Sequence, residues 1–413
     1  MSHIGMLCPP TPGHYNAMTA LGRTLCARGH CVTIFQLPDL RARMEREGLN
    51  FWPLADGQAK TGELAQALEQ LGRVTGLAAV RYTIRLAAKL AQLVLDSAPA
   101  ALREAKVDLA LVDQNEPAGA SAAEHIGLPF VSVATALPLN REPNIPPAFA
   151  PWPYAQNRWG RARNWIGYVV SDRLLSPVTN VLNRRREQWK LPLLHSPDDS
   201  FSRSCQLCTL PKGFDFSRQH PPANFHYVGP FIDASRSEVP FPWERLDGRP
   251  LIYASFGTLQ NRRQELFHSV AEACADLDVQ LVLSAGGGEV DTGSLPGSPL
   301  VVKYAPQLEL LARASLAITH AGLNTVLEAL NVGVPMVAIP VTNDQPAVAS
   351  RVKCVGAGEV VPLTHLSSHR LRAAIDLVLG DENYRRRAQR LMEQIKTSGG
   401  AQRAAEIVEQ QLA

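Results

Sequence analysis

Apolar runs and amphipathic stretches alternate along the whole of this chain of 413 residues. Buried parallel strands are predicted by the length and continuity of the apolar runs at 3–8, 107–113, 251–254, 281–284, 316–319 and 337–340. Helical spacing follows two of these runs, from about 16 to 28 and from 324 to 330, and glycine ends each pattern. Such alternation indicates doubly wound α/β domains.

One stretch of the chain lacks this periodicity. Residues 229–248 are rich in proline and carry neither a clear strand pattern nor a clear helix pattern. A chain of this length suits two domains of about 200 residues each. We therefore predict an N-terminal domain over 1–228, a linker over 229–248, a C-terminal domain over 249–400 and a final helix over 401–413.

The segment 304–345 places polar side chains where an α/β sheet presents groups to a ligand. His320 and Gly322 follow the strand at 316–319. The first N–H groups of the next helix have no partner inside that helix, and the helix dipole favours an anion such as phosphate there. Asn324 and Thr325 would add side-chain donors, and Gly322 would let the main chain come close to the ligand.

Two further polar positions in this segment suit hydroxyl groups rather than phosphate. Glu328 lies one helical turn deeper on the face of Asn324 and Thr325, where a carboxylate would bind vicinal hydroxyls such as those of a ribose. Asp344 and Gln345 follow the strand at 337–340 and offer acceptors and an amide to a sugar. Any one of these residues alone would more often be structural, as a helix cap is. Their combination favours a ligand site.

A histidine and a carboxylate end two strands of the predicted N-terminal domain. His14 lies in the loop that we expect beyond the first strand, and Asp113 ends the strand at 107–113. Parallel strands can bring these two side chains together at the sheet edge where open α/β sheets place their chemistry. The carboxylate would then orient the imidazole as a general base. Asp108 and Glu116 are alternative carboxylates, and a capping role for His14 is the structural alternative.

A third group of small residues follows the strand at 251–254. Ser255, Gly257 and Thr258 form a small, hydroxyl-bearing turn that could face a diphosphate or be an ordinary loop. The glycines at 286–288 lack the G-x-G-x-x-G spacing before a helix, so they do not indicate a dinucleotide site.

Together these motifs resemble the nucleotide-sugar signature of the family 1 UDP-dependent glycosyltransferases, which have the GT-B fold. The matching positions are Tyr304, Pro306, Gln307, His320, Gly322, Asn324, Thr325, Glu328, Gly333, Val334, Pro335, Pro340, Asp344 and Gln345. Tyr304 replaces a tryptophan that stacks on uracil in plant members, and a phenol ring can still stack with less area. The base, uracil or thymine, therefore stays open.

The resemblance implies a fold and a reaction. The fold would be two Rossmann-like domains facing across a cleft, with the final helix crossing back to the first domain. The reaction would be the inverting transfer of a hexose, most simply from UDP-glucose, without metal or another cofactor. His14 and Asp113 would be the base and its partner. The diphosphate would be held by Ser255, Gly257, Thr258, His320, Gly322, Asn324 and Thr325, the base and ribose by Tyr304, Gln307 and Glu328, and the sugar by Asp344 and Gln345.

The N-terminal sequence also resembles bacterial carotenoid and macrolide glycosyltransferases, which implies a bulky apolar acceptor of terpenoid, polyketide or flavonoid type. Two other functions share the fold: a nucleotide-sugar epimerase or lipid-linked sugar transferase, and a non-catalytic helper protein. The Asp344–Gln345 pair and the Gly13–His14 loop fit the first of these less well. The helper would be expected to have lost the residues that are intact here.

The amino-acid composition limits the classes of binding partner and the cellular compartment that we expect for this protein. The 41 basic and 38 acidic side chains nearly balance, which argues against a nucleic-acid partner. Seven scattered cysteines indicate a reducing compartment, and the single C-x-x-C at 205–208 lacks the second pair that a zinc site needs. No apolar run reaches the roughly 18 residues of a membrane span. We expect a soluble, cytoplasmic protein.

The segment 158–190 is both basic and aromatic, with eight basic and two acidic side chains. Such a segment can contact anionic lipid at a membrane surface. The preferred alternative is a pair of surface helices that line the acceptor cleft.

Overall fold

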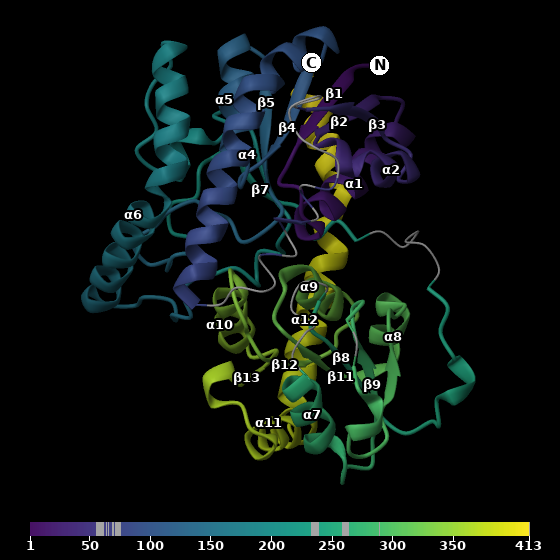
Figure 1. Ribbon diagram of the computed structural model, residues 1–413. Coiled ribbons are helices and arrows are strands. Elements are labelled where there is room, and N and C mark those ends of the chain that lie inside the picture. The colour runs from purple at the N-terminus through teal and green to yellow at the C-terminus, as the bar shows by residue number, and fades with distance from the viewer. Residues whose placement is uncertain are drawn as a thin grey trace.

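The computed structural model describes residues 1–54, 62, 64, 66–67, 70, 76–232, 239–257, 264–288 and 290–412. Thr258, which was predicted at the diphosphate, lies outside these residues, and so does part of the predicted linker. The described chain forms two parallel β-sheets with helices on their faces, one above the other in Figure 1. This confirms the α/β class that the alternating pattern predicted.

The first sheet has seven strands in the order β3-β2-β1-β4-β5-β6-β7. Its strands are β1 (His3–Leu7), β2 (Cys31–Gln36), β3 (Asn50–Pro53), β4 (Leu109–Asp113), β5 (Phe130–Ala134), β6 (Gln206–Cys208) and β7 (Phe225–Tyr227). Its helices are α1 (Pro12–Ala27), α2 (Arg41–Arg46), α4 (Gly76–Glu104), α5 (Pro117–Ile126) and α6 (Arg158–Gln188). The strand order reverses between β1 and β4, and open α/β sheets bind ligands at such a switch point.

The second sheet has six strands in the order β10-β9-β8-β11-β12-β13. Its strands are β8 (Leu251–Ser255), β9 (Gln280–Ser284), β10 (Leu300–Val302), β11 (Ala314–Thr319), β12 (Met336–Ala338) and β13 (Gly358–Val360). Its helices are α7 (Gln264–Cys274), α8 (Gln307–Arg313), α9 (Leu323–Asn331), α10 (Gln345–Val355), α11 (Ser368–Gly380) and α12 (Glu382–Ser398). This sheet reverses between β8 and β11.

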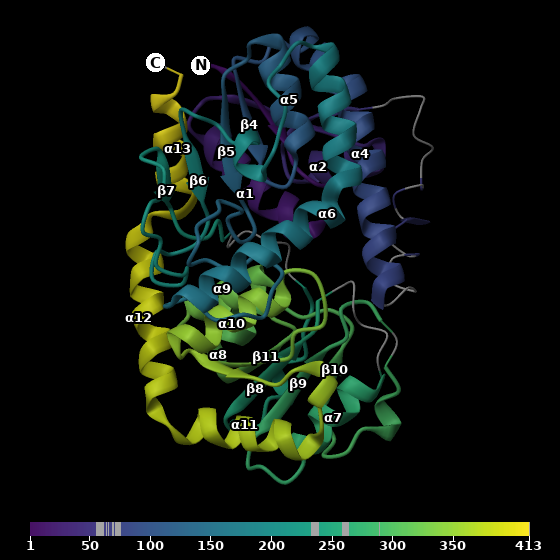
Figure 2. The ribbon, with the colours of Figure 1, turned by 90° about the vertical axis from the view of Figure 1, so that its left-hand side faces the viewer.

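The carboxyl end of the chain joins the two halves. In Figure 2, α12 runs along one side of the molecule from α11 beside the second sheet up to α13 (Gly400–Gln410) beside the first. The last helix packs on α1, where Glu409 accepts hydrogen bonds from Arg28 Nε at 2.8 Å and Nη2 at 2.6 Å. The Gly400 N–H donates to the carbonyl oxygen of Val228 at 2.7 Å.

A buried apolar cluster and a buried ion pair also cross between the halves. Phe214 and Leu210, which lie between β6 and β7, share one core cluster with Val348 and Val352 of α10. Within the same contact, Asp215 Oδ1 accepts from Arg351 Nη2 at 3.0 Å and Nε at 3.1 Å. The other carboxylate oxygen accepts from Arg218 Nε at 2.8 Å. The position of α10 is therefore tied to the first sheet.

Two predicted elements differ from the structure. The first helix begins at Pro12 rather than near 16, because proline at the first helical position has its φ already set for a helix. His14 therefore lies in the first turn of α1 rather than in a loop. The predicted pair of surface helices is one helix, α6, which continues through Pro177 and changes direction along its length in Figure 1.

Candidate active site

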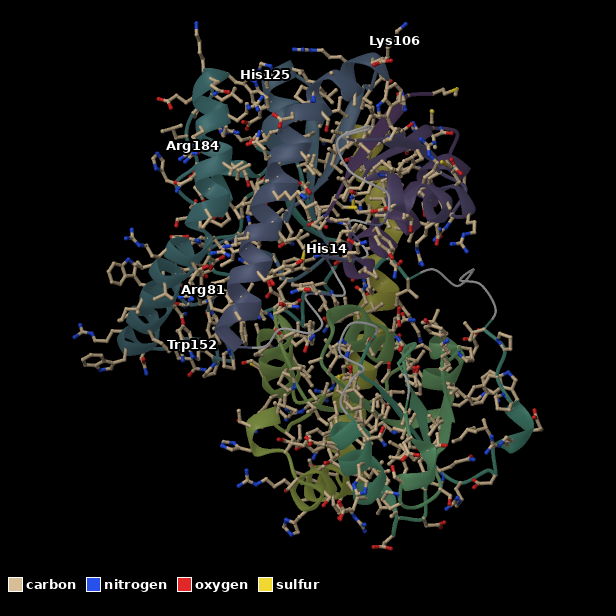
Figure 3. The ribbon with its side chains drawn as sticks, in the orientation of Figure 1. His14, Arg81, Lys106, His125, Trp152 and Arg184 are labelled. Atoms are coloured by element: carbon tan, nitrogen blue, oxygen red, sulfur yellow. The ribbon has the colours of Figure 1, made fainter. Side chains whose placement is uncertain are left out.

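His14 and Asp113 meet at the switch point of the first sheet. Asp113 is the last residue of β4, and His14 lies in the first turn of the helix that follows β1. His14 Nδ1 lies 2.9 Å from Asp113 Oδ2, and the carboxylate is fully buried while the ring keeps 21% of its surface exposed. Figure 3 shows His14 near the middle of the molecule, between its two halves.

Thr135 completes this cluster and was not predicted from the sequence. Its hydroxyl donates a short hydrogen bond to Asp113 Oδ2 and lies 2.9 Å from His14 Nδ1. The Asn115 N–H donates to the other oxygen of Asp113 at 2.8 Å. With Nδ1 engaged as the donor to the carboxylate, Nε2 of His14 is left to accept a proton. A sequence signal for Thr135 existed, because it directly follows the strand β5.

The electrostatics of the cluster favour a charged pair. Burial lowers the pKa of His14, but the Asp113 charge and hydrogen bond, with smaller contributions from Asp344 and Glu116, outweigh it and raise the pKa. Burial raises the pKa of Asp113, yet the His14 charge and the hydrogen bonds from His14, Thr135 and Asn115 bring it below its ordinary value. His14 can therefore hold a proton once it has taken one.

The two alternative carboxylates have different positions. Asp108 accepts a hydrogen bond from the His3 N–H at 2.7 Å, at the opposite edge of the sheet from His14. Glu116 lies beside the cluster as the residue before α5. Burial and then the charge of Asp113 raise the pKa of Glu116 to about 8, so it is a poor partner for an imidazolium. Asp113 is the carboxylate that contacts His14.

His320 lies at the switch point of the second sheet, immediately after β11. The ring is 9% exposed, and its Nδ1 has no hydrogen-bond partner among the described residues. Burial lowers its pKa to about 4, partly offset by the main chain of Ser255, so the ring is neutral. A Cβ added to Gly322 would lie 2.4 Å from His320 Nε2, and one added to Gly257 would lie 3.0 Å from the ring. The two glycines thus make room for the imidazole.

The N-terminus of α9 has the geometry that binds an anion at other helix N-termini. Gly322 precedes the helix, and the first hydrogen bond inside it runs from the Val326 N–H to the Gly322 carbonyl. The N–H groups of Leu323, Asn324 and Thr325 therefore have no partner within the helix. Ala321 has φ +63°, in the left-handed region, and this strained residue turns the chain from β11 towards α9.

Asn324 links this helix to the histidine of the other half. Its Nδ2 donates to the carbonyl oxygen of Gly13 at 3.1 Å, one residue before His14. A cavity between the halves is lined by α1, by the chain segments after β6 and after β7, and by α9. Its lining residues are Ala17, Thr209, Pro230, Phe231, Ile232, Asn324, Leu327 and Glu328. Asn324 and Glu328, which were predicted at the diphosphate and the ribose, thus face the half of the molecule that carries His14.

Glu328 and Gln307 belong to one buried network. Gln307 Nε2 donates a short hydrogen bond to Glu328 Oε2, and its Oε1 accepts from the Tyr253 hydroxyl at 3.2 Å. Gln307 Nε2 also lies 3.4 Å from the Thr325 hydroxyl. Gln307 therefore orients the Glu328 carboxylate in this arrangement. Tyr253, which was not predicted, lies inside β8, and its hydrogen bond helps to hold the side-chain amide of Gln307 in place.

Asp344 and Gln345 lie where β12 leads into α10, but their side chains are used differently. Gln345 Oε1 accepts from the N–H groups of Val341 at 2.9 Å and Thr342 at 3.0 Å. Its oxygen therefore shapes the loop, and only its NH₂ group is left for a ligand. Burial raises the pKa of Asp344, whereas the charge of His14 lowers it. Asp344, which was predicted to bind the sugar, and His14, which was predicted to be the general base, therefore interact electrostatically.

Tyr304 and Ser255 both lie at the carboxyl ends of strands of the second sheet, Tyr304 exposed and Ser255 buried. Tyr304 follows β10 and is 51% exposed, and its hydroxyl is 2.4 Å from a Cβ built on Gly287. The ring therefore lies beside the glycine-rich loop with much of its surface open for stacking. Ser255 is buried at the end of β8, between the ends of β9 and β11.

The structure supplies no metal-ligand cluster in the part of the chain that it describes. No group of three or more His, Cys, Asp or Glu side chains is placed there to hold an ion. Cys205 and Cys208 of the C-x-x-C are buried free thiols, and burial raises the pKa of each to about 12. Such thiols are poor metal ligands.

The chain is similar to known proteins along most of its length. The profile of the family described as "UDP-glucoronosyl and UDP-glucosyl transferase" matches residues 59–397. A zeaxanthin glucosyltransferase of Pantoea ananas is 34% identical over 99% of this chain and 96% of its own length. A zeaxanthin glucosyltransferase of Pseudescherichia vulneris is 35% identical over 100% of this chain and 98% of its own length.

A solved structure has the same architecture. The glycotransferase of kitacinnamycin has a TM-score of 0.78 against this chain at 24% identity, and the match covers 100% of this chain and 99% of that one. At this identity the likeness shows the fold alone. It confirms the GT-B fold that the motifs predicted.

Proposed function

This chain belongs to the family of UDP-glucuronosyl and UDP-glucosyl transferases, and from that premise we propose that it transfers a hexose to a hydroxyl group of a bulky apolar acceptor. UDP-glucose is the proposed donor, and a carotenoid alcohol is the first proposed acceptor. Both choices are supported by the two zeaxanthin glucosyltransferases that are 34% and 35% identical to this chain. Polyketide and flavonoid-like alcohols are further candidates for the acceptor.

The observation that carries the proposal is the His14–Asp113–Thr135 cluster facing the N-terminus of α9. Nε2 of His14 removes the proton of the acceptor hydroxyl, and the oxygen attacks the anomeric carbon of the hexose. The bond from that carbon to the diphosphate breaks, and UDP leaves from the opposite side, so the configuration inverts. Asp113 and Thr135 orient the ring and stabilise the imidazolium. Base catalysis of this kind contributes roughly 10²- to 10⁴-fold in rate.

The second sheet supplies the donor site in this proposal. The free N–H groups of α9, the neutral His320 and the side chains of Asn324 and Thr325 receive the diphosphate and its growing charge. Glu328 binds the ribose, and the ring of Tyr304 stacks on the base. Asp344 and the NH₂ group of Gln345 bind the hexose. Support for the diphosphate position comes from Nδ1 of the buried His320, which has no hydrogen-bond partner among the described residues.

The proposal also covers cofactor and compartment. Backbone and side-chain donors neutralise the leaving group, so the reaction needs no metal and no other cofactor. The enzyme acts in the cytoplasm, where its seven cysteines stay reduced. Peripheral contact with a membrane is part of the proposal, and α6 supplies a surface for it.

UDP release tests this proposal. The full chain is incubated with UDP-glucose and a panel of hydroxylated apolar acceptors that includes zeaxanthin, with a chelator present. We expect UDP release that depends on the acceptor and is unchanged by the chelator. Loss of release with the chelator would overturn metal independence. Silence with every acceptor, while UDP still raises the melting temperature, would keep the donor site and reject the proposed sugar or acceptor.

A further inference from the structure

The helix α6 has its large apolar side chains on the outside. Trp159 is 79% exposed and Trp165 is 67% exposed, although tryptophan is normally among the more buried residues. Seven of the fourteen exposed large apolar side chains of the described residues lie on this one helix. We call the outer face the side that carries Trp159, Trp165, Ile166, Val169, Val170 and Leu174.

Specific contacts on the inner side of α6 set the rotation of this helix about its axis. The apolar side chains of the outer face are therefore held towards solvent. Asn164 is fully buried, and its Nδ2 donates to the Pro143 carbonyl at 2.9 Å. The Tyr168 hydroxyl donates to the Ile145 carbonyl at 2.8 Å. The ring of Trp152 lies so close to Gly167 that an added Cβ would be 2.6 Å from it. The usual pattern of a surface helix is therefore reversed.

The outer face also carries positive charge without neutralising partners. Arg158, Arg161 and Arg173 are exposed, and within the described chain none of them forms an ion pair with a carboxylate. Asp172 is the acidic residue of this stretch, and it already pairs with Arg141 at 2.9 Å. Exposed tryptophans beside free arginines are typical of segments that lie in the interface of an anionic bilayer.

We propose that the outer face of α6 binds the surface of an anionic phospholipid bilayer. Trp159, Trp165 and the neighbouring aliphatic side chains enter the boundary between headgroups and acyl chains, and the arginines contact lipid phosphates. No helix among the described residues is long and apolar enough to cross a bilayer, so the contact is peripheral. A second copy of the chain fits this face less well, because two faces with unpaired arginines would repel each other.

Membrane binding through α6 would bring an acceptor dissolved in the bilayer close to the candidate active site, an inference that rests on the proposed function. Figure 2 shows α6 crossing the front of the molecule, with its first half at the level where the two halves meet. The loop 136–157 joins Thr135, which contacts His14, to the start of α6. In that loop the Trp152 carbonyl accepts from Ser350 Oγ of α10 at 2.9 Å. An acceptor dissolved in the bilayer would thus meet the enzyme at the side where the base and the donor domain are joined.

Vesicle flotation with the full chain tests the proposal without any substrate. The vesicles are phosphatidylcholine alone, or equal parts of phosphatidylcholine and phosphatidylglycerol. We expect the wild type to float with the anionic vesicles, and the Trp159→Ala/Trp165→Ala variant to lose at least about tenfold in bound fraction. Arg158→Ala/Arg161→Ala should lose roughly fivefold per arginine. Unchanged melting temperature and UDP binding would show that both variants are folded.

Matched variants on another surface test whether vesicle binding depends on the outer face of α6 or on exposed apolar and basic side chains in general. Leu377→Ala/Leu379→Ala removes exposed apolar side chains from α11, and Arg386→Ala/Arg390→Ala removes exposed arginines from α12. Both should float like the wild type. The proposal is overturned if the wild type does not float, or if the α6 variants and these controls behave alike. A dimer seen by light scattering that the tryptophan variant loses would reassign the face to self-association and also overturn it.

Discussion

At the residue scale, the proposed base is a histidine whose tautomer is set by its neighbours. Asp113 and Thr135 both lie 2.9 Å from Nδ1 of His14, so the proton-accepting nitrogen is Nε2. The two ring neighbours come from the ends of adjacent parallel strands, β4 and β5. The pairing of these two strands therefore fixes where both partners of the ring lie.

Asp113→Asn should change both the rate and its pH dependence. A base must be unprotonated, so kcat/KM should rise with pH through the pKa of His14. Removal of the Asp113 charge takes away the main cause that raises this pKa, so the rise should move to lower pH. The plateau should fall roughly 10²- to 10⁴-fold, because orientation of the ring is lost. The measurement is a pH profile of kcat/KM.

Asp108→Asn is the matched control, since it makes the same change on the opposite edge of the sheet. Its profile should keep the wild-type position. If the rise stays at the same pH in Asp113→Asn, the carboxylate does not act on His14 in the way proposed.

The same residues show how far the sequence alone could lead. His14 and Asp113 were predicted because each lies next to the carboxyl end of an apolar strand. Thr135 obeys the same rule, but a threonine after a strand is too common to single out without its distance to Asp113. The partners of Gln307 and Gln345 also escaped prediction. Gln307 bonds to side chains of β8 and α9 that are distant from it in the sequence, and Gln345 bonds to N–H groups of the loop before α10.

At the element scale, α9 and the turn before it form the proposed diphosphate site. The helix presents three free N–H groups, and His320 lies against Gly257 and Gly322. A neutral ring in that position can donate to a phosphate without the desolvation penalty of a buried charge. The turn is therefore tightly packed as well as polar.

Gly322→Ala should weaken UDP binding while the protein stays folded. The φ of Gly322 is −61°, which any residue adopts, so the main chain is not strained by a side chain. The new Cβ would lie 2.4 Å from His320 Nε2, and the ring would have to move. Overpacking of this kind costs about 1–3 kcal/mol, so we expect the Kd for UDP to rise roughly tenfold or more. Calorimetry measures the change.

Gly380→Ala is the control, because a Cβ at that position meets nothing within 4 Å. Its UDP affinity should equal that of the wild type. An unchanged Kd in Gly322→Ala would remove His320 and its turn from the proposed diphosphate site.

Elements were predictable where the hydrophobic pattern is continuous and less so where proline intervenes. The strands β4, β8, β9 and β11 all fall within or next to the predicted apolar runs. The start of α1 was placed too late, because Pro12 next to Gly13 is also typical of a loop. The segment of α6 was predicted as a pair of helices, but the helix continues through Pro177, a residue type that commonly ends a helix. In both cases packing against neighbouring elements decides the outcome.

At the scale of the whole molecule, a buried ion pair joins the half that carries α10 to the half that carries His14. Arg351 is 1% exposed and bonds to Asp215 across the boundary between the halves. Asp344 precedes the same helix, α10, by one residue. The ion pair therefore positions the proposed sugar residue relative to His14.

Arg351→Ala should destabilise the protein and raise the KM for UDP-glucose. Breaking a buried pair by removing one partner costs about 3–5 kcal/mol, and we expect the lower end because Arg218 still pairs with Asp215. Arg372→Ala, which breaks an exposed pair with Asp376, should cost at most about 1 kcal/mol. Denaturant unfolding and initial rates measure the two effects. Equal losses in the two variants would show that the pair does not hold the halves together.

His14 is the proposed base of a glycosyl transfer whose donor site lies on the other half of the molecule. The most direct measurement compares His14→Ala with the wild type, with turnover of UDP-glucose and zeaxanthin followed beside the Kd for UDP. We expect at least about a hundredfold loss of kcat with an unchanged Kd for UDP, because the proposed nucleotide contacts lie on the second sheet. Unchanged turnover in His14→Ala would show that His14 is not the base.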